Sequence, residues 1–328
     1  MTVLAGDAGG TKTILALVEG EEHDFRFVAE ERYPSNEYAG LAPIVRRFLD
    51  SHGAVVEAAC FGVPGAVSNG ECSTPNLPWF LSEDELQKVT GIPRVKLIND
   101  FAAAAGGVLV LPPGSLLTLQ EGRPVGTGHK AVLGVGTGFG QAILAWDGRE
   151  HLVLPTEAGH ADFAPQGEIQ RALAASLESQ LDHVSVERLV SGPGLKRIYD
   201  FLVERGVSSW PEVREAFAVD DPPAVISSYA LRRRDLACEQ ALDLFFLLYG
   251  AEAGNLALRT LPTGGVYVVG GIAIKNLEKL QDGTFIRAFR RKGRLRALLE
   301  QIPVYVVLDH RVGLLGAARQ AVRLVPVR

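Results

Sequence analysis

Apolar positions along this chain follow two different periods. Short runs of apolar residues predict buried strands, at residues 3–5, 14–18, 25–32 and 56–63, with another that starts at Val95 and ends at Asn99 and Asp100. Apolar residues that recur every three or four positions predict helices at residues 38–52 and 82–89. Gly53 follows the first of these helices as a stop signal, and Ser82 with Glu85 forms a capping box at the start of the second. The alternation of strands and helices predicts an α/β fold.

The same pattern begins again near residue 131. An apolar run at 131–135 leads into a glycine-rich turn at 136–140, a strand at 141–146 and a third strand at 151–154. Because both halves open with a strand, a glycine-rich turn and further strands, the pattern indicates an internal duplication. The chain has 328 residues, which favours two domains. We expect residues 1–110 plus 312–328 to form a small α/β domain and residues 111–311 a large α/β domain with helical insertions.

The second half is mostly helical before two last strands. Helices are predicted at 168–181, 186–190, 194–204, 210–218 and 238–259, and strands at 265–273 and 304–308. A final helix at 313–325 is expected to pack back against the first domain. The apolar helices of this half also suggest a homodimer.

Each glycine-rich turn connects two strands and is therefore a hairpin. In the first turn, Asp7 precedes Gly9 and Gly10, and Thr11 and Lys12 follow. Adjacent glycines allow backbone N–H groups to approach an anion, and Thr11 and Lys12 add a hydroxyl and a cation. The spacing differs from that of the helix-linked phosphate loop of nucleotide hydrolases. A plain hairpin would need the glycines but neither Asp7 nor Lys12, so the turn favours phosphate binding.

The second turn contains Gly136, Thr137 and Gly138. Two phosphate-type turns, one in each domain, predict a nucleoside triphosphate in the cleft between the domains.

The strand that starts at Val95 ends in an amide and a carboxylate, Asn99 and Asp100. Ligands of open α/β sheets bind beyond the carboxyl ends of strands, so a carboxylate there is a candidate for chemistry. The alternative is that Asn99 or Asp100 caps the helix that follows, as such residues often do.

Three more segments combine polar groups or glycines with strand or helix ends. Glu157 and His160 could be metal ligands, a catalytic pair or hydroxyl-binding groups, although no cysteine lies nearby to complete a zinc site. The run from Ser191 to Gly194 is either a helix link or a backbone contact for a ligand. The pair Gly270 and Gly271 either lets a flat ring lie against the backbone or forms a tight turn.

The composition and charge of the chain argue against some classes of binding partner. The chain is 47% hydrophobic and 22% charged, with a net charge of -5, which argues against a binder of nucleic-acid backbones. A local cationic cluster is expected to be the solvated face of a helix, and it consists of Arg287, Arg290, Arg291, Lys292, Arg294 and Arg296. Three cysteines without disulfide or metal spacing fit a reducing, cytoplasmic compartment. No signal peptide and no membrane partner are expected.

These motifs together resemble the bacterial glucokinases over essentially the whole chain. The resemblance rests on Asp7 with Gly9, Gly10 and Thr11, the run from Leu97 to Phe101, Gly136 to Gly138, Glu157 with His160, Ser191 to Leu195, and Gly270 to Ile272. It implies a fold of the sugar kinase, Hsp70 and actin superfamily: two ribonuclease-H-like (actin-like ATPase) domains with an inter-domain cleft. It also implies an enzyme that uses ATP and Mg²⁺ to phosphorylate glucose at its 6-hydroxyl, giving glucose 6-phosphate and ADP.

The resemblance further implies a role for each matching residue. Asp100 is similar to the family's general base, and Asp7 to the group that holds Mg²⁺, through water. The sugar hydroxyls would be bound by Asn99, Glu157, His160 and Glu187, with His160 and Glu187 toward the anomeric end. The phosphates would face Gly9, Gly10, Thr11, Lys12, Gly136, Thr137 and Gly138, and Gly192 and Gly271 would border the adenosine.

The chain departs from the family at a few positions. Lys12 stands where several similar glucokinases have asparagine and is typical of the repressor, open-reading-frame and kinase (ROK) family, but that family's cysteine-rich zinc motif is missing. Lys12 either adds a charge near the phosphates or points to solvent. Ala158 replaces a common glycine. Two other functions stay open: a kinase for another hexose or an N-acetylated amino sugar, and a non-catalytic sugar or nucleotide sensor.

Overall fold

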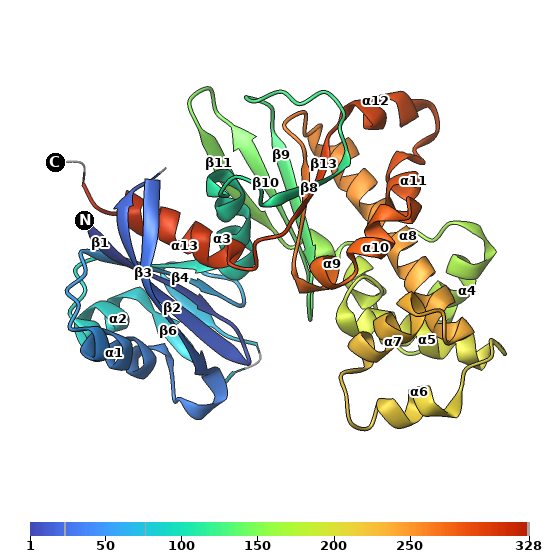
Figure 1. Cartoon of the computed structure of the whole chain (residues 1–328), viewed down its shortest axis with the longest axis horizontal. Coiled ribbons are helices and arrows are strands. Elements are labelled where there is room, and N and C mark those ends of the chain that lie inside the picture. Colours follow the sequence, from blue (N-terminus) through green and yellow to red (C-terminus); the bar gives the residue numbers. More distant parts are fainter. Residues whose placement is uncertain (23, 76, 327–328) are drawn as a thin grey trace. The chain divides into compact units, whose positions relative to one another are not determined.

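The structure is a computed structural model that describes residues 1–22, 24–75 and 77–326. Its contacts divide the chain into two compact units (Figure 1). Unit 1 consists of Met1–Ser115, Val153–Pro155 and Asp309–Arg328, and unit 2 consists of Leu116–Leu152 and Thr156–Leu308. The last two residues of the small domain expected from the sequence, 327 and 328, lie outside the described residues.

The sheet of unit 1 has the strand order β3-β2-β1-β4-β7. Its strands are β1 (Thr2–Ala8), β2 (Lys12–Glu21), β3 (Asp24–Pro34), β4 (Ala58–Val63) and β7 (Val95–Asn99). The first three strands form an antiparallel meander, and β4 and β7 continue parallel to β1. The carboxyl ends of β1, β4 and β7 therefore lie at the same edge, which is where the sequence places Asp7, Asn99 and Asp100.

Two pairs of helices cover this sheet. One face packs on α1 (Leu41–His52) and α2 (Glu83–Thr90), the other on α13 (Val312–Arg323), as Figure 1 shows; α3 (Asp100–Gly107) packs against α13. Strand β1 serves both faces because its side chains alternate: Leu4 belongs to the α1 core, and Val3 and Ala5 to the α13 core. The remaining elements are η1 (Ser35–Glu37), β5 (Glu71–Ser73), β6 (Phe80–Ser82) and η2 (Val108–Val110).

The sheet of unit 2 repeats this order with one more strand, β11-β10-β9-β12-β13-β8. The strands are β8 (Leu116–Gln120), β9 (Lys130–Val135), β10 (Phe139–Trp146), β11 (His151–Thr156), β12 (Val266–Val269) and β13 (Val304–Val307). As in unit 1, an antiparallel hairpin with a glycine-rich turn is followed by two parallel strands. The duplication inferred from the sequence is confirmed.

Helices form the rest of unit 2, around the long helix α8 (Leu236–Thr260). The others are α4 (Gly167–Glu178), α5 (Gly192–Glu204), α6 (Pro211–Ala216), α7 (Pro222–Leu231), α9 (Gly271–Lys275), α10 (Leu277–Gln281), α11 (Thr284–Arg290) and α12 (Arg296–Gln301), with 3-10 turns η3 (Ala158–His160), η4 (Val186–Arg188) and η5 (Gly293–Leu295).

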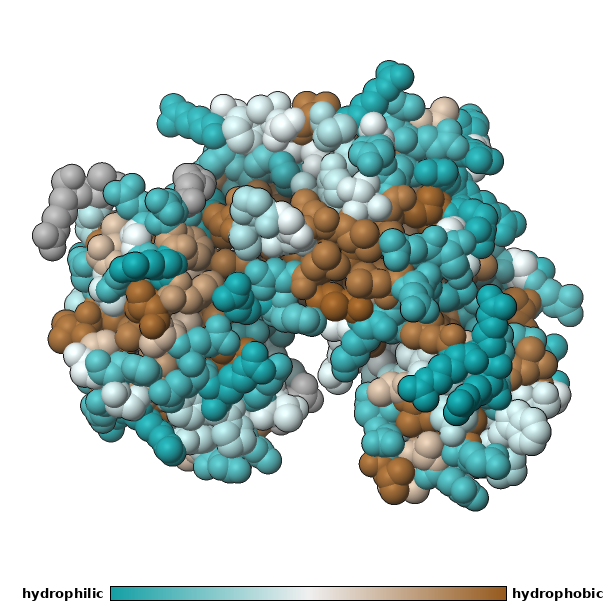
Figure 2. Space-filling view, in the orientation of Figure 1, coloured by the Kyte–Doolittle hydropathy of each residue, from teal (hydrophilic) through white to brown (hydrophobic). Residues whose placement is uncertain are grey.

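Helix α8 has the length and the mean hydropathy of a membrane span, but 72% of its apolar window is buried inside the structure. A helix at the centre of a large core is also apolar on all sides, because every side of it packs against other apolar residues. Figure 2 shows hydrophilic residues interspersed with apolar ones over the visible face of the molecule. Such a mixture is ordinary for a globular surface.

Several predicted elements differ in detail. The strand predicted at 265–273 ends at Val269, because Gly270 has a φ of 100° and α9 begins at Gly271. The helix predicted at 186–190 is only the 3-10 turn η4. Helix α7 has little amphipathic pattern and was not predicted.

The cationic cluster is not simply the solvated face of one helix. Arg290 on α11 donates from Nε to Gln120 Oε1 at 2.5 Å, and Lys292 donates from Nζ to Asn255 Oδ1 at 2.5 Å. These two cations turn inward because the interior offers amide acceptors, whereas Arg291 and Arg294 are exposed.

Candidate active site

The first glycine-rich turn joins β1 to β2 and is held by its own backbone and by η1. Gly9 N–H donates to Lys12 O at 2.9 Å and closes the turn. Ser35 of η1 braces it twice, by donating from Oγ to Gly9 O at 2.7 Å and from its backbone N–H to Thr11 O at 3.1 Å. Ser35 is fully buried. Sequence reasoning missed it, because a serine more than 20 residues from the turn carries no local signal.

Asp7 lies near the end of β1, just before this turn. Burial raises the pKa of Asp7 to about 6; the charge of Asp100 acts in the same direction, and that of Lys12 lowers it. Lys12 is exposed, yet it is close enough to influence this carboxylate. The side chain of Lys12 is thus open to solvent, and its role near the phosphates stays a prediction.

Asn99 and Asp100 stand where β7 passes into α3. Asn99 Oδ1 accepts hydrogen bonds from Phe101 N–H at 2.9 Å and Ala102 N–H at 3.1 Å, so Asn99 is the N-cap of α3. Its Nδ2 donates to Gly65 O at 3.1 Å. The capping alternative is thus realised by Asn99, which leaves one amide hydrogen for a ligand. Asp100 is exposed and begins the helix, with Oδ1 accepting from Phe101 N–H at 2.7 Å.

Close backbone packing positions Asp100. A Cβ at Gly62 of β4 would lie 3.1 Å from Ala103 Cβ, a tight contact, and 3.6 Å from Asp100 Cα, so the start of α3 packs closely against this strand. A Cβ at Gly316 of α13 would lie 1.7 Å from Ala103 O, so α3 and α13 touch backbone to backbone. The sequence shows these glycines but not the partners that require them.

The second glycine-rich turn joins β9 to β10 in unit 2. Gly136 N–H donates to Gly138 O at 2.9 Å, and Gly192 N–H, at the start of α5, donates to Gly136 O at 2.9 Å. Glu187 of η4 reaches the same turn, where its Oε2 accepts from Phe139 N–H at 2.8 Å.

Glu187 also connects this turn to the Glu157 and His160 segment. His160 Nδ1 lies 3.9 Å from Glu187 Oε1, and His160 Nε2 lies 4.0 Å from Glu157 Oε2. Both separations are longer than a hydrogen bond. The three side chains are partly exposed, at 70% for Glu157, 59% for His160 and 28% for Glu187. They form an open group of two carboxylates and an imidazole that is able to accept and donate hydrogen bonds to sugar hydroxyls.

A cavity of about 560 Å³ lies beside the second turn, within unit 2. Its lining includes Gly136, Thr137, Gly192, Pro223, Ile272 and Asn276. Ser191 caps α5, and its Oγ accepts a hydrogen bond from Gly194 N–H at 3.1 Å. The first residues of α5, Gly192 and Pro193, line the cavity, so the N-terminal end of this helix lies beside it. Gly192 lines the cavity. Gly271 is not part of the lining, although the next residue, Ile272, is.

The predicted residues thus form two groups. Unit 1 holds Asp7, the turn from Gly9 to Lys12, Asn99 and Asp100, and unit 2 holds the remaining predicted residues. Comparison with known proteins shows the family to which the chain belongs. The glucokinase family model matches residues 4–324. The chain belongs to the glucokinase family.

The family also appears among individual relatives and solved structures. The glucokinase of Nostoc punctiforme is 44% identical over 338 residues, covering 98% of this chain and 99% of that protein. The crystal structure of a glucokinase from an Antarctic psychrotroph superposes with a TM-score of 0.85 at 28% identity, covering 98% of each chain. A ROK family glucokinase from Streptomyces griseus, solved with glucose and AMPPNP, has a TM-score of 0.65 at 23% identity and covers 98% of this chain and 100% of its own. This last likeness concerns the fold alone.

Family membership makes this chain a kinase that phosphorylates glucose, with the actin-like ATPase fold of the glucokinases. Family membership does not assign a role to each residue, and these roles are inferred from the geometry of the site. Magnesium is the cofactor that the resemblance implies, and Asp7 fits it. Among the described residues, none donates a hydrogen bond to the Asp7 carboxylate, and a cation would compensate the neighbouring charges of Asp7 and Asp100. Mg²⁺ is commonly held by one or two carboxylates together with substrate phosphates, so no larger ligand cluster is needed.

Proposed function

We propose that this glucokinase transfers the γ-phosphoryl group of ATP to the 6-hydroxyl of glucose, with Asp100 as the general base. The observation that supports this most directly is the position of Asp100 at the carboxyl end of β7. Its side chain is exposed, it is close enough to Asp7 to raise that group's pKa, and packed glycines hold its backbone. A carboxylate placed in this way can take the proton of an attacking hydroxyl.

The other residues bind and orient the substrates. Asn99, Glu157, His160 and Glu187 would hydrogen-bond the remaining sugar hydroxyls, because a buried hydroxyl without a partner costs about 1 to 3 kcal/mol. The turns around Gly9 to Lys12 and Gly136 to Gly138 would present N–H groups, hydroxyls and the Lys12 ammonium to the phosphates. Gly192 and Gly271 would border the adenosine. Mg²⁺ held by Asp7, through water, would neutralise charge on the phosphates.

The choice of ATP as donor follows from the two phosphate-type turns and the nearby cavity in unit 2. It also agrees with the structure of the Streptomyces griseus glucokinase, which contains glucose and AMPPNP. The homodimer and the cytoplasmic location stay predictions; all three cysteines are free and buried, as suits a reducing compartment.

An assay of ADP release tests the proposal. The protein is supplied with Mg²⁺ and ATP and offered glucose, fructose, mannose, galactose or N-acetylglucosamine, beside the Asp100→Ala variant. We expect turnover on glucose that the variant loses while it still binds glucose. Turnover on a different sugar would keep the mechanism and move the specificity. Absence of turnover on every sugar would overturn the ATP-dependent reaction and favour a different donor or a sensor.

A further inference from the structure

Unit 2 contains a second cavity, of about 310 Å³, which none of the predicted site residues lines. It lies among α8, α11, the start of α4 and the segment that follows η3. Its apolar lining includes Phe163, Val186, Leu248 and Ala288. The volume is at the lower end of the range typical of small-molecule sites and well below that of the cavity beside the glycine turn. A ligand here would be smaller than a nucleotide.

The polar lining of this cavity has an excess of positive charge. Three cations, Arg287, Arg291 and Lys292, face one carboxylate, Glu252. Glu252 is only 4% exposed and already pairs with Arg259 Nη1 at 3.0 Å, so it does not neutralise the three. The guanidinium of Arg291 makes no hydrogen bond or ion pair with any residue in the described part of the chain; only its backbone N–H is bonded, to Ala288 O at 3.2 Å. These cations belong to the cluster that the sequence predicted to be merely solvated.

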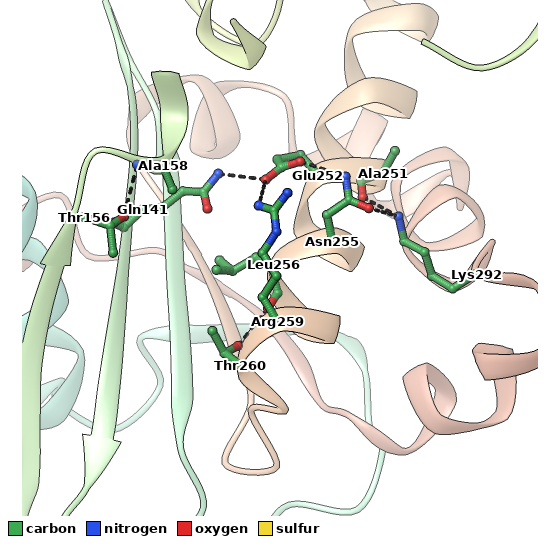
Figure 3. Close-up of polar contacts among 10 residues, drawn as sticks. All are labelled: Gln141, Thr156, Ala158, Ala251, Glu252, Asn255, Leu256, Arg259, Thr260 and Lys292. Carbon is green, nitrogen blue, oxygen red and sulfur yellow. Dashed lines mark hydrogen bonds and ion pairs between the residues drawn. The ribbon is translucent and has the colours of Figure 1, made fainter. Parts of the chain in front are cut away.

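No anionic group among the described residues is in direct contact with the Lys292 ammonium. Its Nζ donates to Ala251 O at 2.8 Å and to Asn255 Oδ1 at 2.5 Å, and both acceptors are neutral (Figure 3). Burial lowers the pKa of Lys292, and the charge of Glu252 acts in the opposite direction without reversing this shift. A bound anion would supply the missing charge.

The walls of this cavity continue into the segments that carry the sugar-binding residues. Phe163 follows His160 by three positions, and its N–H donates to Val184 O at 3.0 Å. Val186 N–H donates to Ala161 O at 2.9 Å, immediately before Glu187. The two segments are therefore fastened together between the cavity and the group of Glu157, His160 and Glu187.

A buried polar chain makes a second connection, which Figure 3 shows. Asn255 donates from Nδ2 to Glu252 Oε2 at 2.8 Å, and Gln141 donates from Nε2 to Glu252 Oε1 at 3.1 Å. Thr156 Oγ1 donates to Gln141 O at 2.9 Å and accepts from Ala158 N–H at 3.3 Å, at the residues on either side of Glu157. These contacts form a continuous path from Lys292 to the residues that flank Glu157, and this path is the route we test below for coupling to the sugar.

We propose that this cavity is an effector site for a small organic anion, a phosphate or carboxylate head on an apolar body, and that its occupation changes the affinity for glucose. The anion contacts Arg291 and Lys292, and the apolar body lies against Phe163 and Leu248. The binding part stands on the cavity alone; the effect on glucose rests on the proposed sugar-binding roles of Glu157, His160 and Glu187.

Isothermal titration calorimetry with phenyl phosphate tests the binding part, and phenol serves as the uncharged probe. The Arg291→Gln variant should weaken binding of phenyl phosphate about 10-fold, the value of one charge-assisted contact. Arg291 is exposed, so this variant is expected to fold normally. The matched control is Arg294→Gln, which removes an exposed arginine outside the cavity lining and should bind within about 2-fold of the wild type.

Equal binding by wild type and Arg291→Gln would overturn the site, and so would equal binding of phenol and phenyl phosphate or no binding up to about 10 mM. Ala288→Leu, which fills the cavity without changing charge, should abolish binding as well and separates this cavity from the phosphate turns. None of these measurements needs turnover, so they remain decisive even if the kinase assay fails.

The effector part is tested by reciprocity. Phenyl phosphate should change the Kd of glucose by about 3- to 10-fold in the wild type but not in Arg291→Gln, and glucose should change the Kd of phenyl phosphate by the same factor. Binding of the probe with no change in the Kd of glucose would overturn the effector role.

Discussion

Two aspartates show how the same side chain is treated differently in the two units. Asp235 caps α8 in unit 2 and is 2% exposed, yet it accepts three hydrogen bonds of 2.8 Å, from Ser209 Oγ, Trp210 N–H and Cys238 N–H. Burial raises the pKa of Asp235, but these bonds outweigh it and the pKa lies below its ordinary value. Asp7 in unit 1 receives no such donor among the described residues, and its pKa rises to about 6.

The difference separates a carboxylate that stabilises the fold from one that is left uncompensated. Buried charges in proteins are normally paired, so a carboxylate with a raised pKa beside a second carboxylate points to a functional site. The raised pKa of Asp7 means that its ionised form lowers stability, whereas the lowered pKa of Asp235 means that its ionised form raises stability. Four predictions test this contrast, from the largest expected effect to the smallest.

Asp100→Asn should lower kcat by about 10² to 10⁴-fold, because an amide cannot take up the proton of the sugar hydroxyl. Glucose affinity and the free energy of unfolding should change little, since the side chain is exposed. Steady-state kinetics and glucose titration check this. The matched control is Asp84→Asn, which changes an exposed aspartate in the first turn of α2. If both variants lost the same small amount of activity, Asp100 would not be the base.

Gly316→Ala should lower the free energy of unfolding by about 2 to 4 kcal/mol and also reduce kcat. The added methyl would lie 1.7 Å from Ala103 O, so α13 and α3 must separate and Asp100 must shift with α3. Urea unfolding and kinetics at a temperature where the variant is folded measure the two effects. Gly126→Ala is the control, since a Cβ there meets nothing within 4 Å. Full activity in a destabilised Gly316→Ala protein would contradict the positioning role.

Asp235→Ala should lower the free energy of unfolding by about 3 kcal/mol with kcat retained, because three donors lose a charged acceptor. Asp235→Asn keeps an acceptor oxygen and should cost less. Because the folded pKa is depressed, the stabilisation is present above the unfolded pKa of about 4 and is lost as the pH falls through the folded pKa. Urea unfolding at pH 7 and pH 3 should show the wild type and Asp235→Ala converging in acid. A gap that stayed constant with pH would argue against ionised Asp235 as the cause.

Asp7→Asn should have the smallest effect on stability, and it should stabilise the protein, whereas Asp235→Ala destabilises it. A raised carboxyl pKa means that the wild type loses stability as the pH rises from the ordinary aspartate value of about 4 through about 6. Without Mg²⁺, the variant should therefore melt about 1 to 3 °C higher than the wild type at pH 8, with no difference near pH 4. Thermal melts in EDTA measure this. A variant less stable than the wild type at pH 8 would remove the contrast with Asp235.

The sequence by itself determined the features that depend on near neighbours. The alternating apolar runs, the two glycine hairpins, the capping by Ser82 and the carboxylate after the Val95 strand all follow from local periodicity and turn chemistry. The polar segment that follows a predicted strand also singled out Glu157 and His160, whereas Glu187 came from the family resemblance alone.

Only the tertiary structure decided what distant residues do to one another. Glu187 meets the turn at Phe139, 48 residues away, and Ser35 braces Gly9 from 26 residues away. Arg290 donates a hydrogen bond to Gln120, 170 residues away, although the sequence around Arg290 predicted a solvated helix face. The physical reason is that a periodic pattern reports whether a side chain is buried, whereas its hydrogen-bond partner and its pKa depend on which segments the folded chain brings beside it.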